Sequence, residues 1–207
     1  MTHTKAPARP IRLLLVRHGE TDENVKGIIQ GQLDTDLNSF GQLQAHLTGQ
    51  YLSKTRIDEV YASPLKRARD TALLIAKEHK QKQPLIYSDD RLMERYFGSL
   101  QGAQRINGVE PDDAEPIESV QKRLGLFWND VIARPGPWPI LQNGSTEDDE
   151  EDIGLRRIEL AALRVPEVAK KYSNISNVTP GLDSEGDLYA RSILIVSHGA
   201  ALKNLIK

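Results

Sequence analysis

The chain has 207 residues, of which 39% are hydrophobic and 27% are charged, a balance typical of a folded globular domain rather than a disordered chain. The formal net charge of −2 excludes a general basic field for nucleic acid, so an anionic ligand must be held by a local cluster of Arg and Lys. The absence of cysteine excludes disulfides, thiolate zinc sites and cysteine nucleophiles, and it is consistent with a reducing, cytoplasmic location.

The first ten residues carry basic residues and prolines without the apolar segment of a signal peptide. We therefore expect residues 1–10 to form a flexible tail and residues 11–207 to form one domain. No run of about 18 apolar residues occurs, so neither a transmembrane helix nor a membrane partner is expected.

Hydrophobic patterning predicts a strand and then a helix at the start of this domain. The apolar run over residues 11–16 stops at a turn, which predicts a strand buried on both faces. A helix over residues 40–53 is predicted next, because apolar residues recur there at helical spacing. The residues that would form its apolar face are Phe40, Leu43, Leu47 and Tyr51.

A second strand and helix are predicted to follow. Residues 58–62 form the strand, and a helix begins directly after it, with Ser63 as its N-cap and Pro64 in its first position. The apolar stripe of this helix consists of Leu65, Ala68, Ala72, Ile75 and His79.

The remaining elements continue the alternation. Strands are predicted over residues 84–87 and 193–196, and helices over residues 119–132 and from Ala201 onward. Alternating strands and helices predict an α/β fold, a three-layer α/β/α sandwich with a mostly parallel central sheet.

The stretch between these last elements differs in composition. Residues 133–152 contain three prolines and an acidic block, so we expect a solvated insertion loop. A helix is predicted to resume from Ile153 and to kink or restart at Pro166. Residues 174–187 are expected to form a second polar loop.

Two histidines occupy equivalent positions after predicted strands. His18 follows the strand over residues 11–16, and His198 follows the strand over residues 193–196; each stands before a glycine. In an open α/β sheet, ligands bind beyond the carboxyl ends of the strands. One histidine there is more often a packing residue, but two in matching positions indicate a shared site.

Two arginines accompany these histidines. Arg17 adjoins His18, and Arg67 lies one turn into the helix after residue 64, which aims it at the same edge if the second strand neighbours the first. Guanidinium groups bind phosphate oxygens bidentately, so two imidazoles and two guanidiniums predict a site for a phosphoryl group. No His-x-x-x-His or similar spacing occurs, so neither a metal nor another cofactor is expected.

The motifs, taken in order, resemble those of the histidine phosphatase superfamily, also called the phosphoglycerate mutase-like family, and most closely its small phosphatase branch. They cover roughly the first half of the chain and its C-terminal end. The matching segments are residues 15–21 with Asn24, residues 31–37 with Gly41, and residues 63–72, 94–102 and 196–199.

The resemblance implies a role for each site residue. His18 would be the nucleophile and form a phosphohistidine, and Glu94 would be the general acid and then the general base. Thr21 has helix capping as an alternative role. The expected ligands of the phosphate are Arg17, Thr21, Asn24, Arg67, His198 and Gly199.

Three functions stay open at this point. The first is a metal-independent phosphomonoester hydrolase with a small phosphorylated substrate, favoured by the likeness of residues 30–34 and 63–68 to the small phosphatase branch. The second is a phosphoglycerate mutase, against which we find no segment suited to a lid. The third is a non-catalytic binding module, which is disfavoured because both histidines and both arginines are retained.

Three features depart from the family pattern. Residues 105–108 replace a segment that usually contains tryptophan. The stretch over residues 133–190 is long and acidic, and we interpret it as an idle insertion rather than a substrate cap. The apolar helical pattern is still running at Lys207, so truncation of the chain stays open as an interpretation.

Overall fold

The computed structural model describes residues 11–80, 83–106, 108–109, 111–133, 158–163 and 191–206. The predicted tail over residues 1–10, nearly all of the predicted acidic loop and the polar segment 174–187 lie outside these ranges. The structures predicted for these three segments therefore stay predictions.

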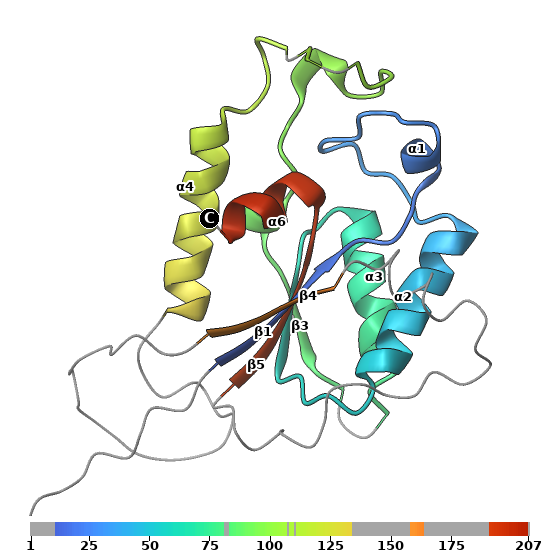
Figure 1. The fold of residues 1–207 in the computed structure, drawn as a ribbon, viewed down its shortest axis with the longest axis vertical. Helices are drawn as coiled ribbons and strands as arrows, with labels where there is room; N and C mark the ends of the chain where they lie inside the picture. The colour runs from blue at the N-terminus through green and yellow to red at the C-terminus, as the bar shows by residue number, and fades with distance from the viewer. Residues whose placement is uncertain are drawn as a thin grey trace, which may run out of the picture.

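A parallel sheet forms the centre of the part that the structure describes (Figure 1). It has five strands in the order β3-β2-β5-β1-β4. The predicted strands are confirmed, with one or two residues added or lost at their ends. The strands are β1 (Ile11–Arg17), β2 (Glu59–Ala62), β3 (Leu85–Ser88), β4 (Ile158–Leu163) and β5 (Arg191–Ser197).

Helices cover both faces of this sheet, which confirms the predicted three-layer sandwich. Helices α2 and α3 lie on one face, and α4 and α6 lie on the other (Figure 1). None of the helices described here has the length and apolar character that crossing a bilayer requires. The helical elements are α1 (Asp22–Val25), α2 (Ser39–Leu52), α3 (Lys66–Lys77), the turns η1 (Asp90–Leu92) and η2 (Gly98–Leu100), α4 (Ile117–Phe127), its π-helical extension η3 (Trp128–Ile132) and α6 (Gly199–Leu205).

Each central strand contributes alternate side chains to two separate cores. In β1, Leu13 and Leu15 pack with α4 and α6, whereas Leu14 and Val16 pack with α2 and α3. All four are at most 3% exposed. Burial on both faces explains the continuous apolar run, because a parallel strand covered by helices on each side has no solvent face.

Strand β2 is not the neighbour of β1, although we expected Arg67 at the shared edge on the condition that the two strands are adjacent. Strand β5 lies between them, since Val196 pairs with both Val16 and Ala62. Arg67 still reaches the same edge of the sheet, because α3 begins close after the carboxyl end of β2.

The buried face of α2 also differs from the prediction. Phe40 and Leu43 are 46% and 48% exposed, while small residues such as Ala45 and Gly49 face the protein. A Cβ atom at Gly49 would come 3.0 Å from the Cα of Ile75 in α3. The close approach of α2 to α3 therefore decides which face of α2 is buried. At the contact between the two helices it favours small side chains over large apolar ones.

Two further predictions about local structure are wrong. The helix predicted to resume from Ile153 is replaced, over residues 158–163, by the edge strand β4, which pairs with β1 along its length. Helix α3 begins at Lys66 with Leu65 as its N-cap, so neither Ser63 nor Pro64 has the predicted place. The hydroxyl of Ser63 is directed to His198 instead.

Candidate active site

His18 and His198 meet at the carboxyl ends of two adjacent strands. Strands β1 and β5 pair in register up to Arg17 and Ser197, and the N–H of His18 donates to the carbonyl oxygen of Ser197 at 3.0 Å. The two imidazole ring centroids lie 5.1 Å apart, close to the spacing of about 4.8 Å between neighbouring strands. The register of the sheet therefore brings the two predicted histidines into one site.

The ring of His18 has a defined proton position. Its Nδ1 atom lies 2.6 Å from the carbonyl oxygen of Gly19, which can only accept, so Nδ1 carries the hydrogen. Burial lowers the pKa of His18 to about 3, and the charges of Arg67 and Arg17 act in the same direction. The neutral ring therefore keeps its lone pair on Nε2, which is the form that a nucleophile requires.

His198 is fully buried and is also held neutral. Burial lowers its pKa well below the ordinary value. A protonated His18 would lower it further, and the positive charges of Arg67 and Arg17 act in the same direction. Its Nε2 atom lies 2.9 Å from the hydroxyl oxygen of Ser63, while its Nδ1 atom is buried without a partner among the described residues. If the Ser63 hydroxyl donates to Nε2, the hydrogen of His198 resides on Nδ1 and is available to a ligand.

Ser63 is a site residue that the sequence reasoning missed. It follows β2 in the way that the two histidines follow β1 and β5, and its N–H donates to the carbonyl oxygen of Val196 at 3.1 Å. Its position directly after a predicted strand was the available signal.

Arg67 presents a buried guanidinium to the same site. Its Nη1 and Nη2 atoms donate to the carbonyl oxygens of Leu33 and Gly31, both at 2.7 Å. Its Nε atom is buried without a partner in the part of the chain that the structure describes. Burial lowers the pKa of Arg67 to about 10, against the opposing charge of Glu94, so the group stays positive near neutral pH.

Arg17 lies beside the start of α6. Its side chain is exposed, and its Nε atom would lie 3.9 Å from a Cβ atom placed on Gly199. A side chain at position 199 would therefore contact the exposed Arg17 side chain, and glycine leaves this space open.

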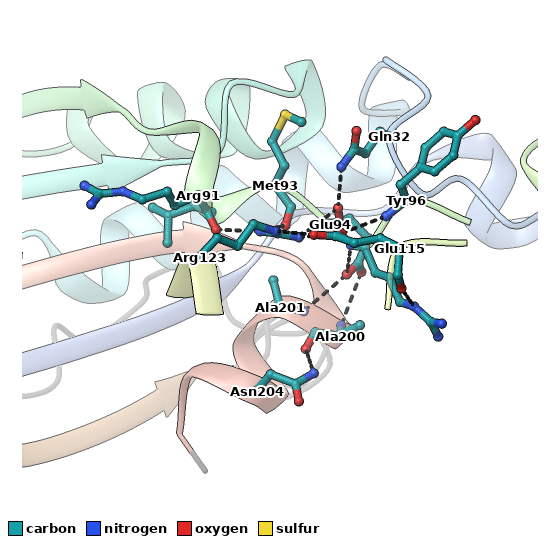
Figure 2. A network of polar contacts seen from close by, with 12 residues as sticks. Gln32, Arg91, Met93, Glu94, Tyr96, Glu115, Arg123, Ala200, Ala201 and Asn204 are labelled. Atoms are coloured by element: carbon teal, nitrogen blue, oxygen red, sulfur yellow. Dashed lines mark hydrogen bonds and ion pairs between the residues drawn. The ribbon is translucent and has the colours of Figure 1, made fainter. Parts of the chain in front are cut away.

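The carboxylate of Glu94 binds the first turn of α6. It accepts hydrogen bonds from the N–H groups of Arg95 at 2.9 Å, Ala200 at 3.2 Å and Ala201 at 3.2 Å (Figure 2). Because Ala200 is two residues after His198, these bonds bring the predicted acid to the predicted histidine pair.

Thr21 and Asn24 lie in the turn after His18 and bind each other. The Thr21 hydroxyl caps α1 by accepting from the N–H of Asn24 at 3.2 Å, and the Asn24 side-chain oxygen accepts from the N–H of Thr21 at 3.1 Å. This reciprocal arrangement is a capping box. It uses the Thr21 hydroxyl, as the capping alternative predicts, and leaves the NH₂ group of Asn24 as its donor toward a ligand.

The arrangement suits a tetrahedral anion. Two guanidiniums surround a neutral ring nitrogen, and the buried atoms Nε of Arg67 and Nδ1 of His198 offer donors that no described protein group uses. Over the described ranges, no three His, Asp or Glu side chains lie close enough together to hold a metal ion.

Residues 13–141 match the family model described as the histidine phosphatase superfamily, branch 1. The chain belongs to the histidine phosphatase superfamily. Among its relatives, a broad-specificity phosphatase of Saccharomyces cerevisiae is 45% identical over 127 residues, which cover 60% of this chain and 54% of that protein. A candidate phosphoserine phosphatase of Hydrogenobacter thermophilus is 42% identical over 194 residues, which cover 94% of this chain and 82% of that protein.

The superfamily fold is also seen in solved structures. A phosphoserine phosphatase of Entamoeba histolytica in complex with 3-phosphoglyceric acid has a TM-score of 0.56 and 24% identity, over 94% of this chain and 77% of that one. The chain spans about half the length of the first curated relatives that it matches, from 45% to 61%.

Proposed function

We propose that this histidine phosphatase hydrolyses a phosphomonoester of small size through a phosphohistidine intermediate on His18. The observation that supports this most directly is the state of the His18 ring, which is neutral, with Nδ1 bound to Gly19 and Nε2 left as a nucleophile beside two arginines. The phosphatases among its relatives support the same reaction class.

In the first step, the Nε2 atom of His18 attacks phosphorus in line with the leaving oxygen. The N–P bond forms as the P–O bond to the leaving group breaks, and charge develops on the equatorial oxygens. Arg17, Arg67 and Nδ1 of His198 stabilise that charge, and Ser63 orients the His198 ring. Asn24 adds an amide donor, and Gly199 leaves room for the phosphate beside Arg17.

In this mechanism Glu94 transfers the protons. It donates a proton to the leaving oxygen in the first step and takes one from the water that attacks the phosphohistidine in the second step. The N–P bond then breaks, inorganic phosphate leaves, and both His18 and Glu94 return to their starting states. The net charge of −2 supports a small phosphorylated substrate rather than nucleic acid. The lack of cysteine supports a cytoplasmic location.

A panel of phosphomonoesters assayed in the presence of EDTA tests the proposal. Phosphate release should survive chelation in the parent and in His46→Ala, a surface histidine paired with Glu78, and should vanish in His18→Ala. Equal activity of His18→Ala and the parent would overturn the nucleophile assignment. Interconversion of phosphoglycerates without net phosphate release would replace the hydrolase by a mutase.

A further inference from the structure

The side chain of Arg123 on α4 is completely engaged with the segment that carries Glu94. Its Nε and Nη2 atoms donate to the Glu115 carboxylate at 2.8 and 3.1 Å. Nη1 donates to the carbonyl oxygens of Arg91 at 2.5 Å and Met93 at 2.8 Å, and Nη2 also donates to that of Glu94 at 3.3 Å (Figure 2). All five N–H donors of the guanidinium are therefore used.

The segment that these bonds hold has no regular structure of its own. Residues 93–97 lie between the turns η1 and η2 and belong to no helix or strand. The amide of Gln32 donates to the carbonyl oxygen of Glu94 at 3.1 Å, and the Glu115 carboxylate accepts from the N–H of Tyr96 at 3.2 Å. Side chains from two distant segments, Gln32 and residues 115–123, thus replace the hydrogen bonds that a helix or sheet would supply.

The charges at this cluster are largely shielded from water. The Arg123 and Glu115 side chains are 18% and 16% exposed, so their pairing is stronger than that of a surface ion pair. A charged fork that binds three backbone carbonyls within four residues, those of Arg91, Met93 and Glu94, fixes the path of the main chain, and a point charge such as Lys cannot reproduce it.

We propose that Arg123, held in place by Glu115, is a positioning residue for the Glu94 carboxylate. The inference rests on the proposed function, in which Glu94 exchanges protons with the leaving oxygen and with water. Arg123 contacts the main chain at Glu94, whose carboxylate reaches the N–H groups of Ala200 and Ala201 at the site (Figure 2). A displacement of this main chain moves the acid away from the leaving oxygen while leaving the histidine pair intact.

The chain supplies a matched control for the loss of a buried Arg–Glu pair. Arg191 binds both carboxylate oxygens of Glu59, and its Nη1 atom donates to the carbonyl oxygen of Val131 at 2.7 Å. It stands at the opposite end of β5 from His198, roughly 20 Å away along the strand. Arg191→Lys should lower stability without moving Glu94.

The test compares kcat/KM for an alkyl phosphate, such as glycerol phosphate, with that for p-nitrophenyl phosphate. An alkoxide needs a proton to leave, whereas p-nitrophenolate does not, and kcat/KM reports the phosphorylation step before hydrolysis of the intermediate. General acid catalysis contributes roughly 10²–10⁴-fold. We expect Arg123→Lys to lose about tenfold or more on the alkyl ester and about threefold or less on the aryl ester, the same pattern as Glu94→Gln in a milder form.

Glu115→Gln is the second variant, because it keeps the shape of the side chain if Arg123→Lys does not fold. A selective loss on the alkyl ester in either variant, absent in Arg191→Lys, supports the positioning role. An equal loss on both esters, or no loss, overturns it while Glu94→Gln keeps its selective defect. If Glu94→Gln itself shows no selectivity, the proposed role of Glu94 fails as well.

Discussion

Nη2 of Arg67 donates a hydrogen bond to the carbonyl oxygen of Gly31 at 2.7 Å, so the loop after α1 holds a guanidinium that comes from α3. Nη1 makes the equivalent bond to Leu33 at 2.7 Å. The loop can bend in this way because Gly31 has a φ of +53°, which favours glycine. In the proposed mechanism Arg67 also binds the phosphate, so phosphate binding and the conformation of this loop would be coupled through one side chain.

Arg67→Lys should lose both functions of this side chain. The ammonium of Lys is a single compact centre, so it cannot reach the two carbonyl oxygens and a phosphate that three separate guanidinium nitrogens face. We therefore expect kcat/KM to fall about 10²-fold or more, and the free energy of unfolding to fall by about 1–3 kcal/mol. Steady-state kinetics and thermal unfolding measure the two effects. Arg69→Lys, at a solvent-exposed position on the same helix, should change neither. Activity of Arg67→Lys equal to that of the parent would remove Arg67 from the site.

The two buried histidines predict a specific dependence on pH. Because the pKa of His18 is lowered to about 3, the unfolded chain binds a proton below about pH 6.5 that the folded chain does not. This contribution to stability is complete above that pH and is lost as the pH falls toward 3, by about 1.4 kcal/mol per pH unit.

Thermal unfolding of the parent and of His18→Asn, compared between about pH 7 and pH 5, isolates this contribution from that of the carboxylates. The variant should lose less stability on acidification. Side-chain ¹⁵N NMR should find His18 and His198 neutral throughout that range. Protonation of either ring near its ordinary pKa would contradict the account.

Ser63→Ala should act through the orientation of His198. Without the hydroxyl at 2.9 Å, Nε2 of His198 has no partner to keep its hydrogen on Nδ1. We expect kcat/KM to fall about tenfold, with a clear partial recovery in Ser63→Thr, which restores a hydroxyl. Phosphate hydrolysis in Ser63→Ala at the rate of the parent would show that the tautomer is set without Ser63.

Two helical glycines should respond to alanine in opposite ways, because the turn after His18 packs closely on Gly41 and nothing packs on Gly125. A Cβ atom at Gly41 would lie 2.1 Å from the carbonyl oxygen of Glu20, so Gly41→Ala should destabilise the protein by about 1–3 kcal/mol and lower activity. Gly125 in α4 has open space around its Cα, so Gly125→Ala should stabilise by about 0.5–1 kcal/mol without changing kcat/KM. Chemical denaturation measures both, and destabilisation by the two changes alike would contradict this packing.

The histidine pair could be predicted because each ring follows an apolar run that is typical of a buried parallel strand. The order of the strands could not be predicted. Val196 pairs with Val16 and Ala62, residues more than 130 positions away, and no local pattern records that choice. The buried face of α2 was missed for a related reason, since the distance between two helices is a tertiary property and decides whether small or large side chains are buried.

The roles of Ser63 and Arg123 were also beyond the sequence reasoning. Ser63 matches the preference for an N-cap, but the helix begins three residues later and its hydroxyl binds His198 instead. Arg123 lies on a predicted helix face where cations are usually solvated. Its partners are mainly backbone carbonyls in an irregular segment, and a sequence pattern does not indicate where such carbonyls lie.

Covalent trapping of the phosphoenzyme tests the central claim most directly. The protein is mixed briefly with a phosphomonoester, quenched in base and analysed by peptide mass spectrometry. The account predicts one phosphoryl group on the imidazole of His18, stable in base, labile in acid and absent from His18→Ala. A phosphoryl group on another residue, or turnover by His18→Ala without any covalent intermediate, would contradict it.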